Sequence, residues 1–215
     1  MMIFEEKRML RFVVSFLWMV AILSAPVSAE QRAVKSLLEI RQDNVVMQEW
    51  DLSCGAATLT TLLNYQHGDL VTEKEVATAL MNRDIYIDNP ILVQLREGFS
   101  LLDLKRYVDQ RGYKGVGLGK LEFEDLVRRA PILVPINTSG YNHFVIFRGT
   151  LGNRVLLADP AWGNRTMTVE QFEKVWIEFG RIGRVGFVVE NKENLIADNS
   201  PGLLAPRSED FPVLY

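Results

Sequence analysis

The feature that most constrains the fold is a change in the spacing of apolar residues at Pro131. Before it, apolar residues recur at helical spacing in four segments, residues 54–65, 72–81, 100–112 and 121–129. After it, short apolar runs predict strands at residues 132–136, 143–147, 155–158 and 185–189. Gly152 and Asn153 predict a hairpin turn between two of these strands. This order indicates an α+β fold, in which an N-terminal helical part packs on an antiparallel sheet.

Other segments complete the predicted secondary structure. Residues 45–47 and 113–118 each resemble a short strand, and residues 82–99 are predicted to form a loop. Thr72-Glu73-Lys74-Glu75 has the pattern of a capping box that opens the helix through Met81, and Thr168 is expected to cap a short helix that ends near Phe179. No internal repeat interrupts this order, so the sequence favours one folded domain with appendages at its ends.

The two ends of the chain are expected to lie outside that domain. Basic residues precede the apolar run 12–23, and small residues at 27–29 are typical of a signal peptidase site. We therefore predict a signal peptide over residues 1–29, a domain over residues 30–190, and an extended or disordered tail over residues 191–215. The alternative is an uncleaved membrane anchor, for which so short an apolar run is unfavourable.

Charge excludes one class of function. The chain has 24 basic and 27 acidic residues and a net charge of −3, and no basic cluster stands out. Nucleic-acid binding surfaces are strongly basic, so we expect no nucleic-acid partner. Removal of residues 1–29 takes away three basic and two acidic residues, which leaves 21 against 25 and a net charge of −4.

Cys54 is the only cysteine of the chain, so no internal disulfide can form. Ser53 or Asp51 can cap the helix that follows, which places Cys54 at or near the first helical residue. The positive end of a helix dipole favours the thiolate form of a cysteine, the form that acts as a nucleophile. The simpler interpretation, a buried cysteine acting as a small apolar residue, remains open at this point.

His143 and Asp159 flank the predicted hairpin. His143 begins one strand and Asp159 ends the next, so pairing through the turn at 152–153 brings both side chains to the same end. A carboxylate there can hold an imidazole in one tautomer and stabilise its charged form. Each residue alone could instead be an ordinary turn residue. Together with Cys54 they supply the nucleophile, base and orienting acid of acyl-transfer chemistry.

Gln48 is a candidate for stabilising the oxyanion. It lies six residues before Cys54, and its side-chain amide could donate a hydrogen bond to the developing charge together with the Cys54 backbone N–H. A zinc site is the main competing use of these residue types, but the local ligand spacing is missing, and we expect neither metal nor cofactor. His67 is most simply a loop residue, because it lies at the far end of the Cys54 helix.

Three ordered blocks carry a resemblance to a known family. They are Gln48 with Asp51-Leu52-Ser53-Cys54-Gly55-Ala56-Ala57, then Asn142-His143-Phe144-Val145-Ile146, then Ala158-Asp159-Pro160-Ala161-Trp162-Gly163. They resemble the C39 family of papain-like cysteine peptidases, best known as the bacteriocin-processing domains of ABC transporters that cut leaders after a double glycine. The resemblance covers about residues 40–190 and implies a papain-like fold. It also implies that Cys54 is the nucleophile, His143 the base, Asp159 the orienting acid and Gln48 the oxyanion-hole donor.

The predicted signal peptide sets this chain apart from the transporter domains. It is similar instead to free-standing, exported C39-like proteins of Gram-negative bacteria, including the one encoded with the functional-amyloid (Fap) secretion system of pseudomonads. This resemblance implies a periplasmic location. It also implies a peptide or protein substrate, which could be an amyloid fibre subunit or part of the secretion machinery. Double-glycine specificity is not implied.

Three functions are compatible with the sequence. The first is an exported cysteine endopeptidase without a stable membrane anchor after signal cleavage. The second is a papain-like module that binds an extended segment of a secreted partner without cutting it. The third is an amidase or acyl-transfer enzyme with the same three residues. The cysteine favours catalysis, because some C39-like domains that only bind leader peptides lack it.

Overall fold

The computed structural model describes residues 35–95, 97–191 and 204–205. The predicted signal peptide and most of the predicted C-terminal tail therefore lie outside the described residues. Within the described part of the chain, no helix is long and apolar enough to cross a bilayer.

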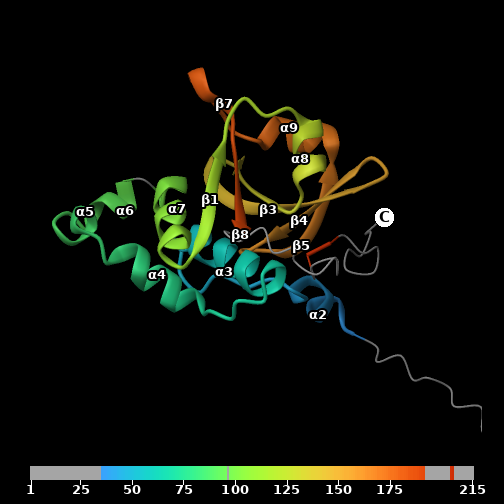
Figure 1. The fold of residues 1–215 in the computed structure, drawn as a ribbon. Coiled ribbons are helices and arrows are strands. Elements are labelled where there is room, and N and C mark those ends of the chain that lie inside the picture. The colour runs from blue at the N-terminus through green and yellow to red at the C-terminus, as the bar shows by residue number, and fades with distance from the viewer. Residues whose placement is uncertain (1–34, 96, 192–203, 206–215) are drawn as a thin grey trace, which may run out of the picture. The chain divides into compact units, whose positions relative to one another are not determined.

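A six-stranded sheet forms the centre of the fold, with the strand order β1-β8-β2-β3-β4-β5 (Figure 1). All neighbouring strands pair antiparallel. The strands are β1 (Tyr113–Leu118), β2 (Ile132–Thr138), β3 (Tyr141–Leu151), β4 (Arg154–Asp159), β5 (Gly163–Thr168) and β8 (Gly186–Asn191). β6 (Glu178–Phe179) and β7 (Gly183–Arg184) form a separate two-stranded sheet. The antiparallel sheet expected from the sequence is confirmed.

Helices cover both faces of this sheet (Figure 1). The larger group includes α3 (Cys54–Gln66), α4 (Glu73–Met81) and α7 (Leu101–Gln110), whose buried side chains share one apolar cluster with Leu133 and Phe187 of the sheet. On the other face, α8 (Phe123–Arg129) and α9 (Val169–Val175) pack on β2, β3 and β4. Three short helices, α2 (Leu37–Gln42), α5 (Asp84–Ile87) and α6 (Ile91–Leu95), complete the set. The α+β prediction is thus confirmed.

Helix starts follow the sequence signals closely. Thr72 and Glu75 form a complete capping box at α4, as predicted, and Ser100 caps α7 in the same way. In a capping box each side chain satisfies the backbone N–H of the other residue, so both helices begin at a defined position. The start of α4 matters for the site, because its first residue, Glu73, is buried beneath the loop that precedes Cys54.

Four details of the predicted secondary structure are wrong. Residues 45–47 form no strand, because the Val46 N–H bonds the Thr61 hydroxyl at 2.9 Å. Residues 82–99 contain the short helices α5 and α6. α9 ends at Val175, since Trp176 pairs with Ile136 of β2. β5 was not predicted, because its polar sequence shows no apolar alternation.

One part of the predicted tail packs against the domain. Leu204 is fully buried in a cluster with Val45, Leu62, Ile146 and Ala158. Its carbonyl accepts a 2.9 Å hydrogen bond from Nε of Arg148, a fully buried side chain of β3. A buried guanidinium needs such acceptors, since desolvating an unpaired charge is costly. The C-terminal segment is therefore part of the folded domain at this point.

Replacing Leu204 with alanine should lower the free energy of unfolding by about 2–5 kcal/mol, the usual cost of removing a buried leucine side chain. Urea denaturation would measure the change. Leu70→Ala is the matched control, because Leu70 is 83% exposed and should change stability little. Equal losses in the two variants would contradict a packing role for Leu204.

Candidate active site

Cys54 is the first residue of α3, as the sequence predicted. Ser53 is the N-cap residue, but its hydroxyl bonds the Trp50 carbonyl at 2.7 Å and does not cap the helix. The Cys54 N–H is one of the backbone donors that an α-helix leaves unpaired in its first turn. Every residue from Cys54 to Leu63 is buried, so the core holds this helix on all sides. The cysteine is thereby fixed at the positive end of a rigid helix.

His143 lies on β3, next to the first turn of α3. The neighbouring residue, Phe144, contacts that helix, because its carbonyl accepts a 3.1 Å hydrogen bond from the Thr58 hydroxyl. A Cβ added at Gly55 would lie 3.4 Å from the Phe144 ring, in van der Waals contact, so the helix and the strand are closely packed there. The His143 side chain is 3% exposed. Close packing of α3 on β3 thus brings the imidazole and the thiol to the same place.

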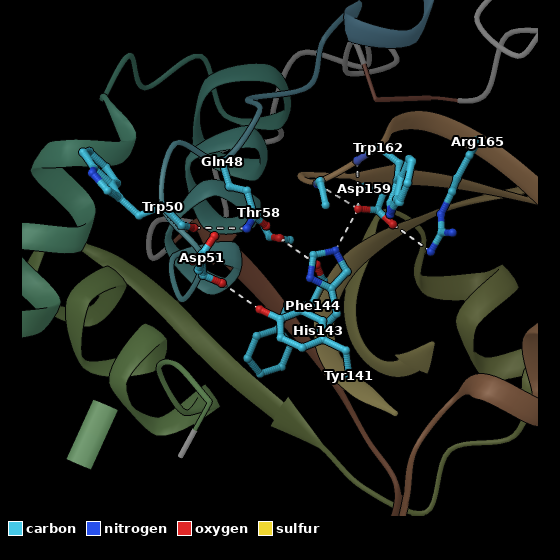
Figure 2. A network of polar contacts seen from close by, with 11 residues as sticks. Gln48, Trp50, Asp51, Thr58, Tyr141, His143, Phe144, Asp159, Trp162 and Arg165 are labelled. Atoms are coloured by element: carbon cyan, nitrogen blue, oxygen red, sulfur yellow. Dashed lines mark hydrogen bonds and ion pairs between the residues drawn. The ribbon is translucent and has the colours of Figure 1, made fainter. Parts of the chain in front are cut away.

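Asp159 ends β4 and is fully buried. Its Oδ1 lies 2.7 Å from Nε2 of His143, so the hairpin places the two residues together as the sequence predicted (Figure 2). Oδ1 also accepts hydrogen bonds from the backbone N–H groups of Ala161 at 2.9 Å and Trp162 at 3.3 Å. Arg165 forms an ion pair with Oδ2 at 2.7 Å. These contacts hold the carboxylate in one orientation.

The charged forms of Asp159 and His143 stabilise each other. Burial raises the pKa of Asp159, but the imidazole, Arg165 and the Ala161 N–H outweigh burial and lower it overall. Burial likewise lowers the pKa of His143, but hydrogen bonds and charge from Asp159 and Cys54 raise it to about 9. Because Nε2 is engaged by Asp159, Nδ1 is the ring nitrogen that remains for the thiol. The structure therefore favours an imidazolium between a carboxylate and Cys54 at neutral pH.

Gln48 lies in the segment before Cys54. Its backbone N–H donates to the Pro160 carbonyl at 2.8 Å, which ties this segment to the turn that follows Asp159. Its side-chain Nε2 donates to the Trp50 carbonyl at 3.1 Å (Figure 2). That bond uses one of the two N–H groups of the amide and orients the other. Gln48 is thus placed near the site, and its donor role remains a prediction.

His67 stands apart from this arrangement. It is the C-cap residue of α3, at the opposite end of the helix from Cys54, and its ring packs on Tyr113. Burial is the largest influence on His67 and lowers its pKa. Among the described residues, no group of three or more histidine, cysteine or acidic side chains could hold a metal ion.

A cavity of about 320 Å³ opens beside the thiol and imidazole. Most of its wall is apolar, and Glu97 is the acidic residue on it. Its lining also includes Cys54, Phe99, Leu101, Pro135, His143, Phe144, Ile177, Phe179, Ile182 and Val185. Such a wall suits an apolar side chain of a bound segment next to the reactive groups.

The sequence did not predict the contacts that several residues make near the site. Arg165 lies in the unpredicted strand β5, so nothing in its neighbourhood indicated a partner for Asp159. Tyr141, whose hydroxyl donates to the Asp51 carbonyl at 2.6 Å, joins β3 to the loop before Cys54 (Figure 2). Asn142 donates to Glu97 at 2.9 Å. The block Asn142-His143-Phe144-Val145-Ile146 was the signal for Asn142, and no signal indicated Tyr141.

The fold and the arrangement of thiol, imidazole and carboxylate define a papain-like cysteine peptidase class. The model of the Peptidase C39 family matches residues 42–179, and the chain belongs to this family. Both the family and the cysteine peptidase class expected from the sequence are confirmed.

Two relatives are each named "Probable functional amyloid protease FapD". The protein of Pseudomonas aeruginosa is 35% identical over 156 residues, which cover 71% of this chain and 66% of that protein, just under two thirds of its length. The protein of Pseudomonas fluorescens is 32% identical over 181 residues, which cover 81% of this chain and 74% of that protein.

Solved structures of C39 domains share the fold. A double glycine motif protease from an AMS/PCAT transporter, in complex with the leader peptide, superposes with a TM-score of 0.54 at 23% identity. The match covers 68% of this chain and 90% of that one. The peptidase domain of Streptococcus ComA, a bi-functional ABC transporter involved in a quorum sensing pathway, also gives 0.54 at 14% identity, with 70% of this chain and 100% of that one covered.

Proposed function

We propose that this chain is an exported cysteine endopeptidase of the periplasm that cleaves a peptide or protein of a functional-amyloid secretion or assembly system. The observation that carries the proposal is the 2.7 Å contact of His143 with Asp159 beside a cysteine at a helix start, where Cys54 and His143 line one mostly apolar cavity. The names of the two Pseudomonas relatives support the amyloid connection. The apolar run and the small residues before Glu30 support export.

The proposed mechanism uses three side chains in sequence. The Cys54 thiolate attacks the scissile carbonyl carbon, and the carbonyl electron pair moves to the oxygen. Gln48 and the Cys54 N–H donate hydrogen bonds to that oxyanion. The carbonyl then re-forms, the C–N bond breaks, and the His143 imidazolium gives its proton to the leaving amine. This leaves a thioester on Cys54 and a neutral imidazole.

Water completes the cycle. Neutral His143 takes a proton from water as the oxygen attacks the thioester carbonyl, and collapse of the intermediate releases the acid product and the thiolate. Asp159 keeps the imidazole in the orientation that serves both steps and stabilises its charged form. Arg165 and the N–H groups of Ala161 and Trp162 keep Asp159 ionised and in place.

The experiment is a cleavage assay with residues 30–215, using purified fibre subunits and secretion proteins of such a system as candidate substrates. Mass spectrometry of the products identifies new termini, and Cys54→Ser is the inactive control. We expect one or a few defined cuts that the variant does not make. Binding of a subunit without cleavage, together with full function of Cys54→Ser in cells, would instead establish the non-proteolytic module.

Location is tested separately. In cells that produce the full chain, fractionation should find the mature protein in the periplasm, with Glu30 as its first residue. Recovery of the uncleaved chain in the cytoplasmic or membrane fraction would contradict export through a cleavable signal.

A further inference from the structure

A buried acid lies beneath the loop that precedes the nucleophile. Glu73, the first residue of α4, is only 4% exposed. Its two carboxylate oxygens accept from the Glu49 backbone N–H at 3.2 and 3.0 Å. Among the residues that the structure describes, no lysine or arginine forms an ion pair with Glu73. A carboxylate buried in this way depends on the loop for its hydrogen bonds.

The same carboxylate reaches the residue next to Cys54. Burial raises the pKa of Glu73, while the nearby Ser53 side chain and the Glu49 N–H oppose that rise. The Ser53 hydroxyl gives its one proton to the Trp50 carbonyl at 2.7 Å, and Gln48 donates to the same carbonyl at 3.1 Å. The loop over residues 48–53 is thereby connected from Glu73 to the Gln48 amide.

We propose that Glu73 is a positioning residue that sets the conformation of the 48–53 loop, so that the Gln48 amide points at the oxyanion. This inference rests on the proposed function. Glu73 contacts neither Cys54 nor His143 in any hydrogen bond or ion pair between described residues. Its removal should therefore disturb the oxyanion donor and leave the thiol and imidazole pair in place.

Two reagents separate these effects. The Cys54 thiol adds to the C=O bond of a peptide aldehyde and forms a hemithioacetal. The oxygen of this adduct occupies the position of the oxyanion. Iodoacetamide alkylates the same sulfur by displacement of iodide and forms no oxyanion. A misplaced Gln48 amide should weaken aldehyde binding and leave the alkylation rate unchanged.

The variants are Glu73→Ala and Glu73→Gln, with Glu75→Gln as the control. Glu75 lies in the same helical turn and is exposed, and a glutamine there removes the charge but can still accept the hydrogen bonds of Thr72 that cap α4. We expect Glu73→Ala to weaken aldehyde binding and lower kcat by about 10–100-fold, less than the loss of a whole oxyanion donor. KM should stay within about threefold, since the loss concerns the transition state. Glu73→Gln should recover part of the loss, because its amide oxygen can still accept the Glu49 N–H.

Three outcomes would overturn the proposal. They are an unchanged aldehyde affinity in Glu73→Ala, an equal fall in aldehyde affinity and alkylation rate, or the same losses in Glu75→Gln. If Glu73→Ala does not fold, Glu73→Gln, which keeps the size of the side chain, is tested in the same way, and an unchanged aldehyde affinity in that variant overturns the proposal. Should wild type cleave no peptide, the proposed function fails, yet the comparison of aldehyde with iodoacetamide still decides the role of Glu73.

Discussion

Replacing His143 with alanine is expected to lower kcat/KM for peptide hydrolysis by about 10²–10⁴-fold, the range that a positioned general acid and base supplies. The imidazole is needed to protonate the leaving amine and to activate water. Its charge also favours the thiolate, so iodoacetamide should alkylate the thiol of His143→Ala more slowly than that of wild type at pH 6 to 7. Initial rates of both reactions would be measured on the mature chain.

His67→Ala is the matched control, because the chain has two histidines and His67 lies at the other end of α3. Both rates should stay within about twofold of wild type in this variant. Equal alkylation of wild type and His143→Ala would contradict a working pair of thiol and imidazole. In that case a partner would be needed to assemble the site.

Replacing Asp159 with asparagine should lower kcat by about 10²–10⁴-fold, because the imidazole loses the group that orients it. The pH profile should change as well. In wild type the imidazolium persists up to a pKa of about 9, and activity that needs it should fall above that pH. Without the carboxylate, burial of the ring dominates and the alkaline limit should move to lower pH. Asp125→Asn, on the opposite face of the sheet, should leave the profile unchanged.

Stability should respond to pH through the same group. The pKa of His143 in the folded protein, about 9, is above the ordinary value of 6.5. Its proton therefore stabilises the fold fully below pH 6.5, and this contribution is lost as the pH rises through 9. Urea denaturation between pH 6 and 10 should show the decline in wild type and a smaller one in Asp159→Asn. An identical decline in both proteins would show that the carboxylate does not hold the proton on His143.

Helices and turns could be predicted from the sequence where the local pattern of apolar and capping residues matches the way the element packs in the fold. The helix at Cys54, the capping box at Thr72 and the hairpin through Gly152 were predicted correctly, because each depends on residues close together in the chain. The hairpin also made the approach of His143 to Asp159 predictable from strand pairing alone.

The features that could not be predicted from the sequence depend on contacts between residues that are distant in the chain. β5 has no apolar alternation and is a strand because it pairs with β4 along its whole length. Arg165 therefore reaches Asp159 through a pairing that no local pattern indicated. α9 stops early because Trp176 pairs with Ile136 of β2, a residue distant in the chain. Glu73 has the sequence context of an ordinary acidic residue in a first helical turn, and only the fold brings the Glu49 N–H to its carboxylate.

The complete burial of the first turns of α3 separates what packing requires of this helix from what catalysis requires of it. Ala56 and Ala57 are small because the neighbouring elements leave no room, a demand that holds with or without a nucleophile at position 54. A variant that exchanged Cys54 for another small residue would keep the same helix and lose the chemistry. The small residues after position 54 thus serve the packing of the fold, whereas catalysis depends on Cys54 together with His143 and Asp159.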